Sequence, residues 1–198
     1  MKKPVLHQLL QLSFGQYVEV WSGLIFEHYQ IGMSDEELFG KLKLSAEDEA
    51  RFSVEYSAIL MTIAALSLDV KPKLTSEKYH DRLIDQMAEN AYQKIMPDAD
   101  KETVQYCFQF FRTKLKIFGQ ICKNIASKDA SKRSADLAGF ARYLVAQVDD
   151  SDEEKNAKAI ERLGILLSEA SDCFIRLVLN SVQDTIRLDG KPSFSVQK

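Results

Sequence analysis

The chain has 198 residues, of which 45% are hydrophobic and 28% are charged. This composition is typical of a globular protein and argues against global disorder, and the length suits one fairly large domain better than two very small ones. Only 8 Gly and 4 Pro are present, which disfavours an all-β fold because such a fold needs frequent turn residues. The formal net charge of −3 supplies no overall field that would attract nucleic acid or an anionic membrane.

The first part of the chain predicts two helices. Apolar side chains recur every three or four residues over 4–30, which indicates an amphipathic helix with one buried face. Ser34, with Glu37 three residues later, forms a capping-box pattern. This pattern predicts a short second helix that ends near Leu42.

A third helix is expected at the centre of the fold. Ser45 is a good cap for it, and the acidic residues that follow complement the helix dipole. The helix extends to about Leu68 and becomes apolar on nearly every side over 59–68, which predicts the most buried segment of the protein. This apolar stretch is about half as long as a membrane-spanning helix, and Pro72 follows it as a helix breaker.

Four further helices are predicted in the rest of the chain. The second of them carries a wide aromatic face and is expected to be another central helix. The last is the longest, about 50 Å if it is continuous, so it is expected to bend or to project from the body. The four helices begin at Thr75 or Ser76, at Asp98 or Asp100, near Ser134 and within 149–154, and they end near residues 96, 127, 148 and 188.

These elements predict an all-α, single-domain helical bundle of about six to seven helices over 1–188, with a long C-terminal helix. Gly190 and Pro192 favour a helix end before them. Residues 189–198 are therefore expected to form a frayed C-terminal tail.

Two charge patterns lie on consecutive predicted helices. One is a row of acids at strict i, i+4 spacing, namely Glu77, Asp81, Asp85 and Glu89. The other is the most basic region of the chain, 112–133, where Asp129 is the only acid. A cation site on the acids and a nucleic-acid face on the basic helix are the functional alternatives. Mutual pairing is the favoured interpretation, because charged helix faces are usually solvated or paired.

The short connection at 96–98 predicts that these two helices form an antiparallel hairpin. In that arrangement Asp81 faces Arg112 and Glu77 faces Lys116, as exposed ion pairs worth about 0.5 kcal/mol each. Three basic residues have no partner in this scheme and are expected to form a small open basic patch. They are Lys128, Lys132 and Arg133.

No catalytic residue, cofactor or metal site is predicted, and the sequence points away from an enzyme. It contains neither a nucleophile elbow nor a Gly-rich phosphate loop. Glu77 and His80 form the Glu-x-x-His element that carboxylate-bridged di-iron bundles use. That element needs a second copy, and neither His7 nor His28 has a Glu three residues before it. A metal-dependent enzyme of ferritin-like type is therefore the weakest alternative.

The cysteines and the N-terminus indicate a cytoplasmic protein. Cys107, Cys122 and Cys173 are widely spaced, and each lies inside a predicted helix, which favours buried thiols over disulfides. Polar side chains interrupt the moderately apolar stretch 5–12, and no cleavage-site pattern follows it. The chain is expected to be neither secreted nor membrane-spanning.

The lack of site chemistry favours a non-enzymatic binding or regulatory module that acts through protein–protein contacts. The partner is either another protein or a second copy of the chain, joined as a homodimer through the long C-terminal helix. Nucleic acid and membrane are not expected as partners.

The alternative function is that of a helical sensor, which binds a small apolar ligand in a cavity lined by aromatic side chains. Such a cavity would lie between the first helix and the aromatic helix. Core packing is the competing explanation, because aromatic rows at helical spacing are more often core. The candidate ligand-binding residues are Trp21, Tyr106, Phe110 and Phe111.

Overall fold

The structure, a computed structural model, describes residues 9–149, 153–186 and 190–197. In that part of the chain it contains seven α-helices, one turn of 3-10 helix (η1, Leu68–Val70) and a small sheet. The helices are α1 Phe14–Met33, α2 Glu36–Leu42, α3 Ala46–Ser67, α4 Glu77–Ile95, α5 Lys101–Ile121, α6 Ala130–Ala146 and α7 Glu153–Asn180. The strands are β1 Leu9–Ser13, β2 Ser181–Ile186 and β3 Pro192–Gln197. The mostly all-α fold with a long C-terminal helix is confirmed.

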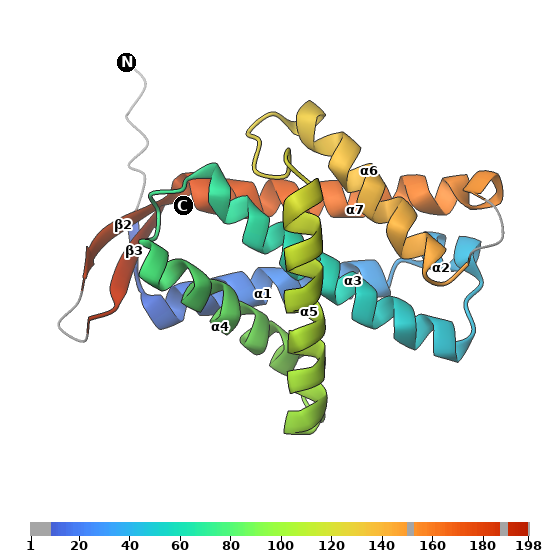
Figure 1. Cartoon of the computed structure of the whole chain (residues 1–198), viewed down its shortest axis with the longest axis horizontal. Coiled ribbons are helices and arrows are strands. Elements are labelled where there is room, and N and C mark those ends of the chain that lie inside the picture. Colours follow the sequence, from blue (N-terminus) through green and yellow to red (C-terminus); the bar gives the residue numbers. More distant parts are fainter. Residues whose placement is uncertain (1–8, 150–152, 187–189, 198) are drawn as a thin grey trace, which may run out of the picture.

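The molecule is elongated, with α1, α3 and α7 along its length and the sheet at one end (Figure 1). α3 lies in the middle, where it packs against α1, α5 and α7. α4 packs on α1, and α6 packs on α7. α5 runs across the long axis instead of along it (Figure 1), so part of its surface has no neighbouring helix to cover it.

Polar caps set most of the helix starts. Ser45 accepts a hydrogen bond from the backbone N–H of Asp48 and Asp100 accepts one from that of Thr103, which confirms both predicted caps. The cap of α2 is Asp35 and not Ser34, because the Asp35 carboxylate accepts from the backbone N–H three residues later. The predicted capping box at Ser34 was therefore wrong by one residue.

The two ends of the chain form a sheet that the sequence did not predict. β3 lies between β1 and β2 and pairs antiparallel with both. Residues 9–13 are therefore strand and not helix, α7 ends at Asn180 instead of near residue 188, and 192–197 are paired instead of frayed. The other residues assigned to the helix start and the tail, 1–8, 187–189 and 198, lie outside the described residues.

Phe194 explains why the chain returns to the body after α7. Its side chain is completely buried and stacks on the ring of Tyr17 in α1, with 4.1 Å between the ring centroids. Tyr17 in turn donates a hydrogen bond to Ser181 at the start of β2. The core of the helical body therefore continues into the sheet, and burial of an aromatic side chain stabilises the strand.

α3 is the most buried helix, as expected. Of residues 59–68 only Leu66 is not fully buried. The stretch Ala46–Val70 is long and apolar enough to cross a membrane by composition alone, but most of it lies inside the protein, as in the core helix of a soluble protein. Gly32 of α1 lies against the ring of Tyr56 of α3. A Cβ atom on Gly32 would lie only 2.3 Å from the phenol oxygen of Tyr56. Only glycine therefore allows α1 and α3 to approach here.

Candidate binding surface

α5 has one buried face and one exposed apolar face. Cys107, Phe108 and Phe111 point into the core. On the other side Tyr106, Ile117 and Ile121 are 68%, 47% and 66% exposed. Their spacing of 11 and 4 residues places them on one side of the helix. They are three of the eight large hydrophobic side chains exposed in the described part of the chain, more than any other element carries.

A surface hollow of about 500 Å³ lies along the second half of α5. Ile117 provides its apolar side chain, and Arg112, Thr113, Lys116 and Gln120 complete the lining. A hollow with an apolar residue between polar ones is suited to receive a side chain from a binding partner. We call the exposed face formed by Tyr106, Ile117, Ile121 and this hollow the α5 surface.

Around Ile117 and Ile121 the α5 surface is bordered by basic side chains. The sequence contains no Asp or Glu between Glu102 and Asp129. Lys116, Lys123 and Lys128 are all exposed, and none of them forms an ion pair with another described residue of the chain. Their charges are therefore available to a partner.

A nearly buried polar cluster holds α5 against α3 and α6. Lys114 Nζ lies 3.1 Å from both carboxylate oxygens of Glu55 and also donates to the hydroxyl of Tyr143. The side chains of Lys114 and Glu55 are only 14% and 9% exposed. The ammonium also lies 4.5 Å from the ring centroid of Phe110 and 4.8 Å from that of Tyr143, which adds cation–π attraction.

The cluster keeps Lys114 charged. Burial by itself lowers the pKa of this lysine, but its hydrogen bonds to Tyr143 and Glu55 outweigh burial and raise the pKa above its usual value. The pKa of Tyr143 is also raised, chiefly by burial. A charged lysine between a carboxylate and a neutral phenol is a stable anchor, and it fixes the orientation of α5.

The predicted pairing of the acidic row with α5 is present, but in a different register. Arg112 Nη2 lies 2.5 Å from Asp85 Oδ1, so the partner of Arg112 is Asp85 and not Asp81, one helical turn away. The side chain of Glu77, the predicted partner of Lys116, lies outside the described residues. α5 runs across α4 instead of antiparallel to it (Figure 1). The predicted pairs assumed two helices lying side by side along their whole length, and crossing helices do not keep that register.

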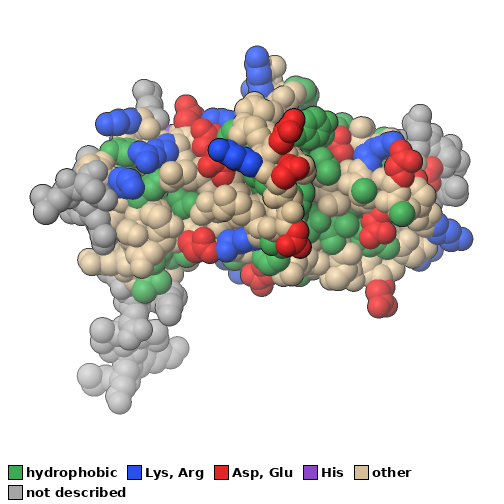
Figure 2. All heavy atoms as spheres, turned by 90° about the horizontal axis from the view of Figure 1, so that it is seen from below, with side chains coloured by type: hydrophobic (Ala, Val, Ile, Leu, Met, Phe, Trp, Pro, Cys, Tyr) green, Lys and Arg blue, Asp and Glu red, His purple; other side chains and the backbone are tan. Residues whose placement is uncertain are grey.

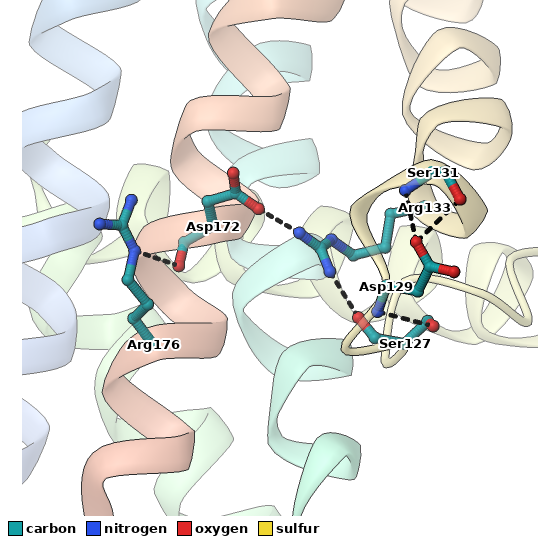
Figure 3. Close-up of polar contacts among 6 residues, drawn as sticks. All are labelled: Ser127, Asp129, Ser131, Arg133, Asp172 and Arg176. Atoms are coloured by element: carbon teal, nitrogen blue, oxygen red, sulfur yellow. Dashed lines mark hydrogen bonds and ion pairs between the residues drawn. The ribbon is translucent and has the colours of Figure 1, made fainter.

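Arg133 is buried and paired, which corrects the prediction that it belongs to an open basic patch. Its side chain is only 4% exposed. One guanidinium nitrogen donates to the carboxylate of Asp172 on α7, and the other donates to the carbonyl of Ser127 at 2.6 Å (Figure 3). The guanidinium therefore joins α7 to the loop before α6. Sequence could not show this, because Asp172 is 39 residues away.

Hydrogen bonds that involve Arg133, Asp129 and Asp136 fix the loop that carries Lys123 and Lys128. Asp129 caps α6 by accepting from the backbone N–H and the hydroxyl of Ser131 (Figure 3). Asp136 accepts a hydrogen bond from the backbone N–H of Asn124 at 2.8 Å. The two lysines therefore extend from an ordered loop next to the end of α5, and they continue the positive border of the α5 surface.

The four predicted ligand-binding residues lie in different environments. Trp21 is completely buried on α1, where its ring contacts Tyr17 and Phe174. Phe111 is completely buried on α5, and Phe110 lies under the ammonium of Lys114. Tyr106 is mostly exposed. No ring contact among the described residues joins Trp21 to the other three predicted residues, and of the four only Tyr106 belongs to the α5 surface.

The apolar positions of α7 are used inside a single chain. The positions that suggested a dimer interface are Ile160, Leu163, Leu167, Ala170, Phe174, Leu177, Val178 and Val182. All except Val182 are buried or half-buried, and Val182, which is 50% exposed, lies in β2 beyond the end of α7. The helix packs against α1, α2, α3 and α6. Its exposed large apolar residues, Ile165 and Leu179, are 14 positions apart, about 21 Å along the helix. α7 therefore offers less exposed apolar surface than α5.

Sequence reasoning missed Ile117 and Ile121. They were overlooked because they lie outside the predicted buried row of α5, which runs through Phe111 and Phe118. Apolar residues outside the buried row of a helix, in a stretch without acids, were the available signal. That signal is visible in the sequence, but only knowledge of which side of α5 is covered gives it meaning.

The other titratable groups of the described residues form neither a metal site nor a reactive thiol. His80 lies 3.8 Å from Asp69 and 3.9 Å from Asp81, in a second surface hollow. Among the described residues no group of three or more His, Cys, Asp or Glu side chains is arranged to hold a metal ion. The three cysteines are free, and burial raises the pKa of each thiol, that of Cys122 to about 11, which makes them poor nucleophiles at neutral pH.

Charges of both signs are scattered over the face of the molecule from which α5 begins. Figure 2 shows basic and acidic side chains interspersed there, with hydrophobic patches between them. This face therefore presents no continuous basic surface of the kind that binds a phosphate backbone. The acid-free stretch lies further along α5.

No residue role can be carried over to this chain from a related protein. Comparisons of the chain with protein-family models, with curated proteins and with solved structures found no match. The contacts, burial and charges of its own residues carry the functional inference.

Proposed function

We propose that this chain is a non-enzymatic helical binding module of the cytoplasm that contacts a protein partner through the α5 surface. The observation that carries the proposal is the alignment of Tyr106, Ile117 and Ile121 in solvent on one side of a single helix. Single exposed apolar residues are common and need no explanation. Several of them in one row, next to a hollow, are typical of a protein interface with an apolar centre and a polar rim.

The way α5 is held supports the proposal. Lys114 and Glu55 anchor the helix from its buried side, and Arg112 ties it to α4. The exposed face is therefore displayed on a rigid element and does not have to be ordered when a partner binds. Binding to a preordered surface costs less conformational entropy.

Site-specific photo-crosslinking tests the proposal. A photoreactive amino acid replaces Gln120 in the hollow, and in a matched control it replaces Glu161, an exposed residue of α7. Irradiation in the cells from which the protein comes is followed by mass spectrometry of the adducts. We expect a specific protein adduct, or a dimer of the chain, from position 120 only.

Variants establish whether the adduct depends on the apolar row. The double variant Ile117→Asp/Ile121→Asp is expected to lose the adduct, whereas Ile165→Asp, a matched change on α7, retains it. Circular dichroism checks that each variant is folded. Equal adducts from positions 120 and 161, or adducts unaffected by the double variant, would contradict the proposal.

A further inference from the structure

We infer that the segment bound by the α5 surface is an acidic amphipathic helix. This inference rests on the proposed function, since it assigns the chemistry of whatever partner contacts α5. It has two parts, the charge of the partner and its backbone conformation, and each part follows from a separate observation.

The charge of the partner follows from the border of the surface. Lys116 lies in the hollow beside Ile117, and Lys123 and Lys128 follow on the ordered loop after α5. The stretch 103–128 contains no acid, and Glu55 and Asp85, which lie against α5, already pair with Lys114 and Arg112. Asp129 and Asp136 beside the loop accept hydrogen bonds from backbone N–H groups and form no ion pair with Lys116, Lys123 or Lys128 among the described residues. A partner with carboxylates at its rim gains attraction here, whereas a basic partner is repelled.

The helical conformation follows from what α5 offers. The backbone N–H and C=O groups in the body of a helix are bonded within it, so the α5 surface has no free backbone edge with which an extended peptide could pair. An extended segment would leave its own polar backbone groups without partners at an apolar contact. A helix satisfies these groups internally and presents apolar side chains in a row. The row from Tyr106 to Ile121 is about 22 Å long, which about four turns of a partner helix would cover.

An anionic membrane fits the same positive border less well. The first turn of α5 carries Glu102 and is preceded by Asp98 and Asp100, so acids lie at the Tyr106 end of the row. An anionic bilayer is an extended surface that faces more of the molecule than a bound helix does, so the net charge of −3 opposes the bilayer more strongly.

Binding of two designed peptides tests the inference. Both are helical, about 18 residues long, with the same Leu residues on one face. One peptide has Glu and the other has Lys on the flanks of that face. Fluorescence anisotropy measures the affinity of each labelled peptide for the full chain at low salt and at physiological salt. We expect the Glu peptide to bind about tenfold or more tightly than the Lys peptide, and we expect this preference to shrink as salt is added.

Matched variants assign the preference to the α5 surface. Lys116→Glu/Lys123→Glu is expected to abolish or invert the preference, whereas Lys41→Glu/Lys158→Glu, an equal charge change beside α2 and α7, leaves it unchanged. Ile117→Asp weakens binding of the Glu peptide. Thermal unfolding confirms that the variants are folded. Equal affinity for the two peptides, absence of binding to either, or a preference that survives Lys116→Glu/Lys123→Glu would overturn the inference.

The outcome separates this inference from the proposed function. A crosslink from position 120 to a basic or extended segment of a partner would overturn the acidic helix but would leave the α5 surface as a protein-binding site. Sedimentation with phosphatidylserine vesicles provides the remaining comparison. Vesicle binding that is lost in Ile117→Asp would contradict both the acidic helix and the proposed protein-binding function. We expect the chain to stay in the supernatant.

Discussion

α5 and α7 are both amphipathic helices, but the protein uses their apolar residues differently. α7 lies among α1, α2, α3 and α6, and nearly all of its apolar side chains are buried. α5 packs mainly on α3 and α4, so Tyr106, Ile117 and Ile121 remain in solvent. The comparison teaches that an apolar row indicates a contact, whereas the number of neighbouring elements decides whether that contact is internal or external.

The polar anchors of the two helices differ in the same way. Lys114 ties α5 to Glu55, and both side chains are nearly buried. Arg133 ties α6 to Asp172 of α7, but the side chain of Asp172 is 39% exposed. A carboxylate that loses its partner is hydrated easily in the second case and poorly in the first. α5 therefore depends more on its anchor than α7 does.

Phe174→Ala in the buried face of α7 is expected to have the largest effect. The side chain is completely buried and contacts Trp21 and His28, so its removal leaves a cavity that costs about 3–5 kcal/mol of unfolding free energy. Chemical denaturation measures the loss. Ile165→Ala on the exposed side of the same helix is the control, and a similar loss there would show that the two sides of α7 are not distinct.

Lys114→Met is expected to cost about 3 kcal/mol, because it leaves the nearly buried carboxylate of Glu55 without its cation, and only the hydroxyl of Tyr143 still donates to it. The double variant Lys114→Met/Glu55→Gln recovers most of this loss, since no uncompensated charge remains. Arg133→Met is expected to cost less, because solvent reaches Asp172. Urea denaturation of the three variants checks the order. A greater loss in Arg133→Met than in Lys114→Met would reverse the comparison of the two anchors.

Asp35 and Asp85 are expected to give opposite pH dependence, because one carboxylate faces α7 and the other faces α5. The hydrogen bond from Arg162 on α7 lowers the pKa of Asp35. Its contribution to stability is therefore present above the unfolded pKa of about 3.9 and is lost as the pH falls through the lower folded value. Burial raises the pKa of Asp85 and outweighs the attraction of Arg112. Ionisation of Asp85 therefore opposes folding; this opposition begins to decrease as the pH falls to the raised folded value and is gone below the unfolded pKa.

Thermal unfolding of Asp35→Asn and Asp85→Asn between about pH 3 and pH 7 measures this difference. The stability lost in Asp35→Asn is expected to shrink as the pH falls. The stability of the wild type relative to Asp85→Asn is expected to rise as the pH falls over the same range. Parallel curves for the two variants would contradict the opposite signs.

Ile117→Ser and Ile121→Ser in the α5 surface are expected to have the smallest effect on stability. Both side chains are largely exposed, so each change is expected to stay within about 0.5 kcal/mol of the wild type. The same changes are expected to weaken the contact with the partner, and native mass spectrometry detects whether a complex or dimer is lost. A loss of stability as large as that of Phe174→Ala would place these residues in the core.

Much of the helical part of the fold could be predicted, and less of the site. The caps Ser45 and Asp100 and the buried stretch 59–68 depend on residues close in sequence, and local patterns report such features well. The cap at Asp35 was missed by one residue because Ser34 is an equally good cap by type. Of the proposed surface only Tyr106 was predicted as a binding residue, whereas Arg112 and Lys116 were predicted only as ion-pair partners. Ile117 and Ile121 were missed because their exposure depends on which elements pack against α5.

The sequence by itself determined the seven helices of the body but not the strands at the ends of the first and last helices, because periodicity and capping act within a few residues and require no distant partner. Only the tertiary structure decided that β1, β2 and β3 join the two ends of the chain, that Arg133 meets Asp172, and that Arg112 meets Asp85 instead of Asp81. Each of these is a contact between segments far apart in sequence. Such contacts depend on crossing directions and on burial by neighbours, and no local pattern encodes either.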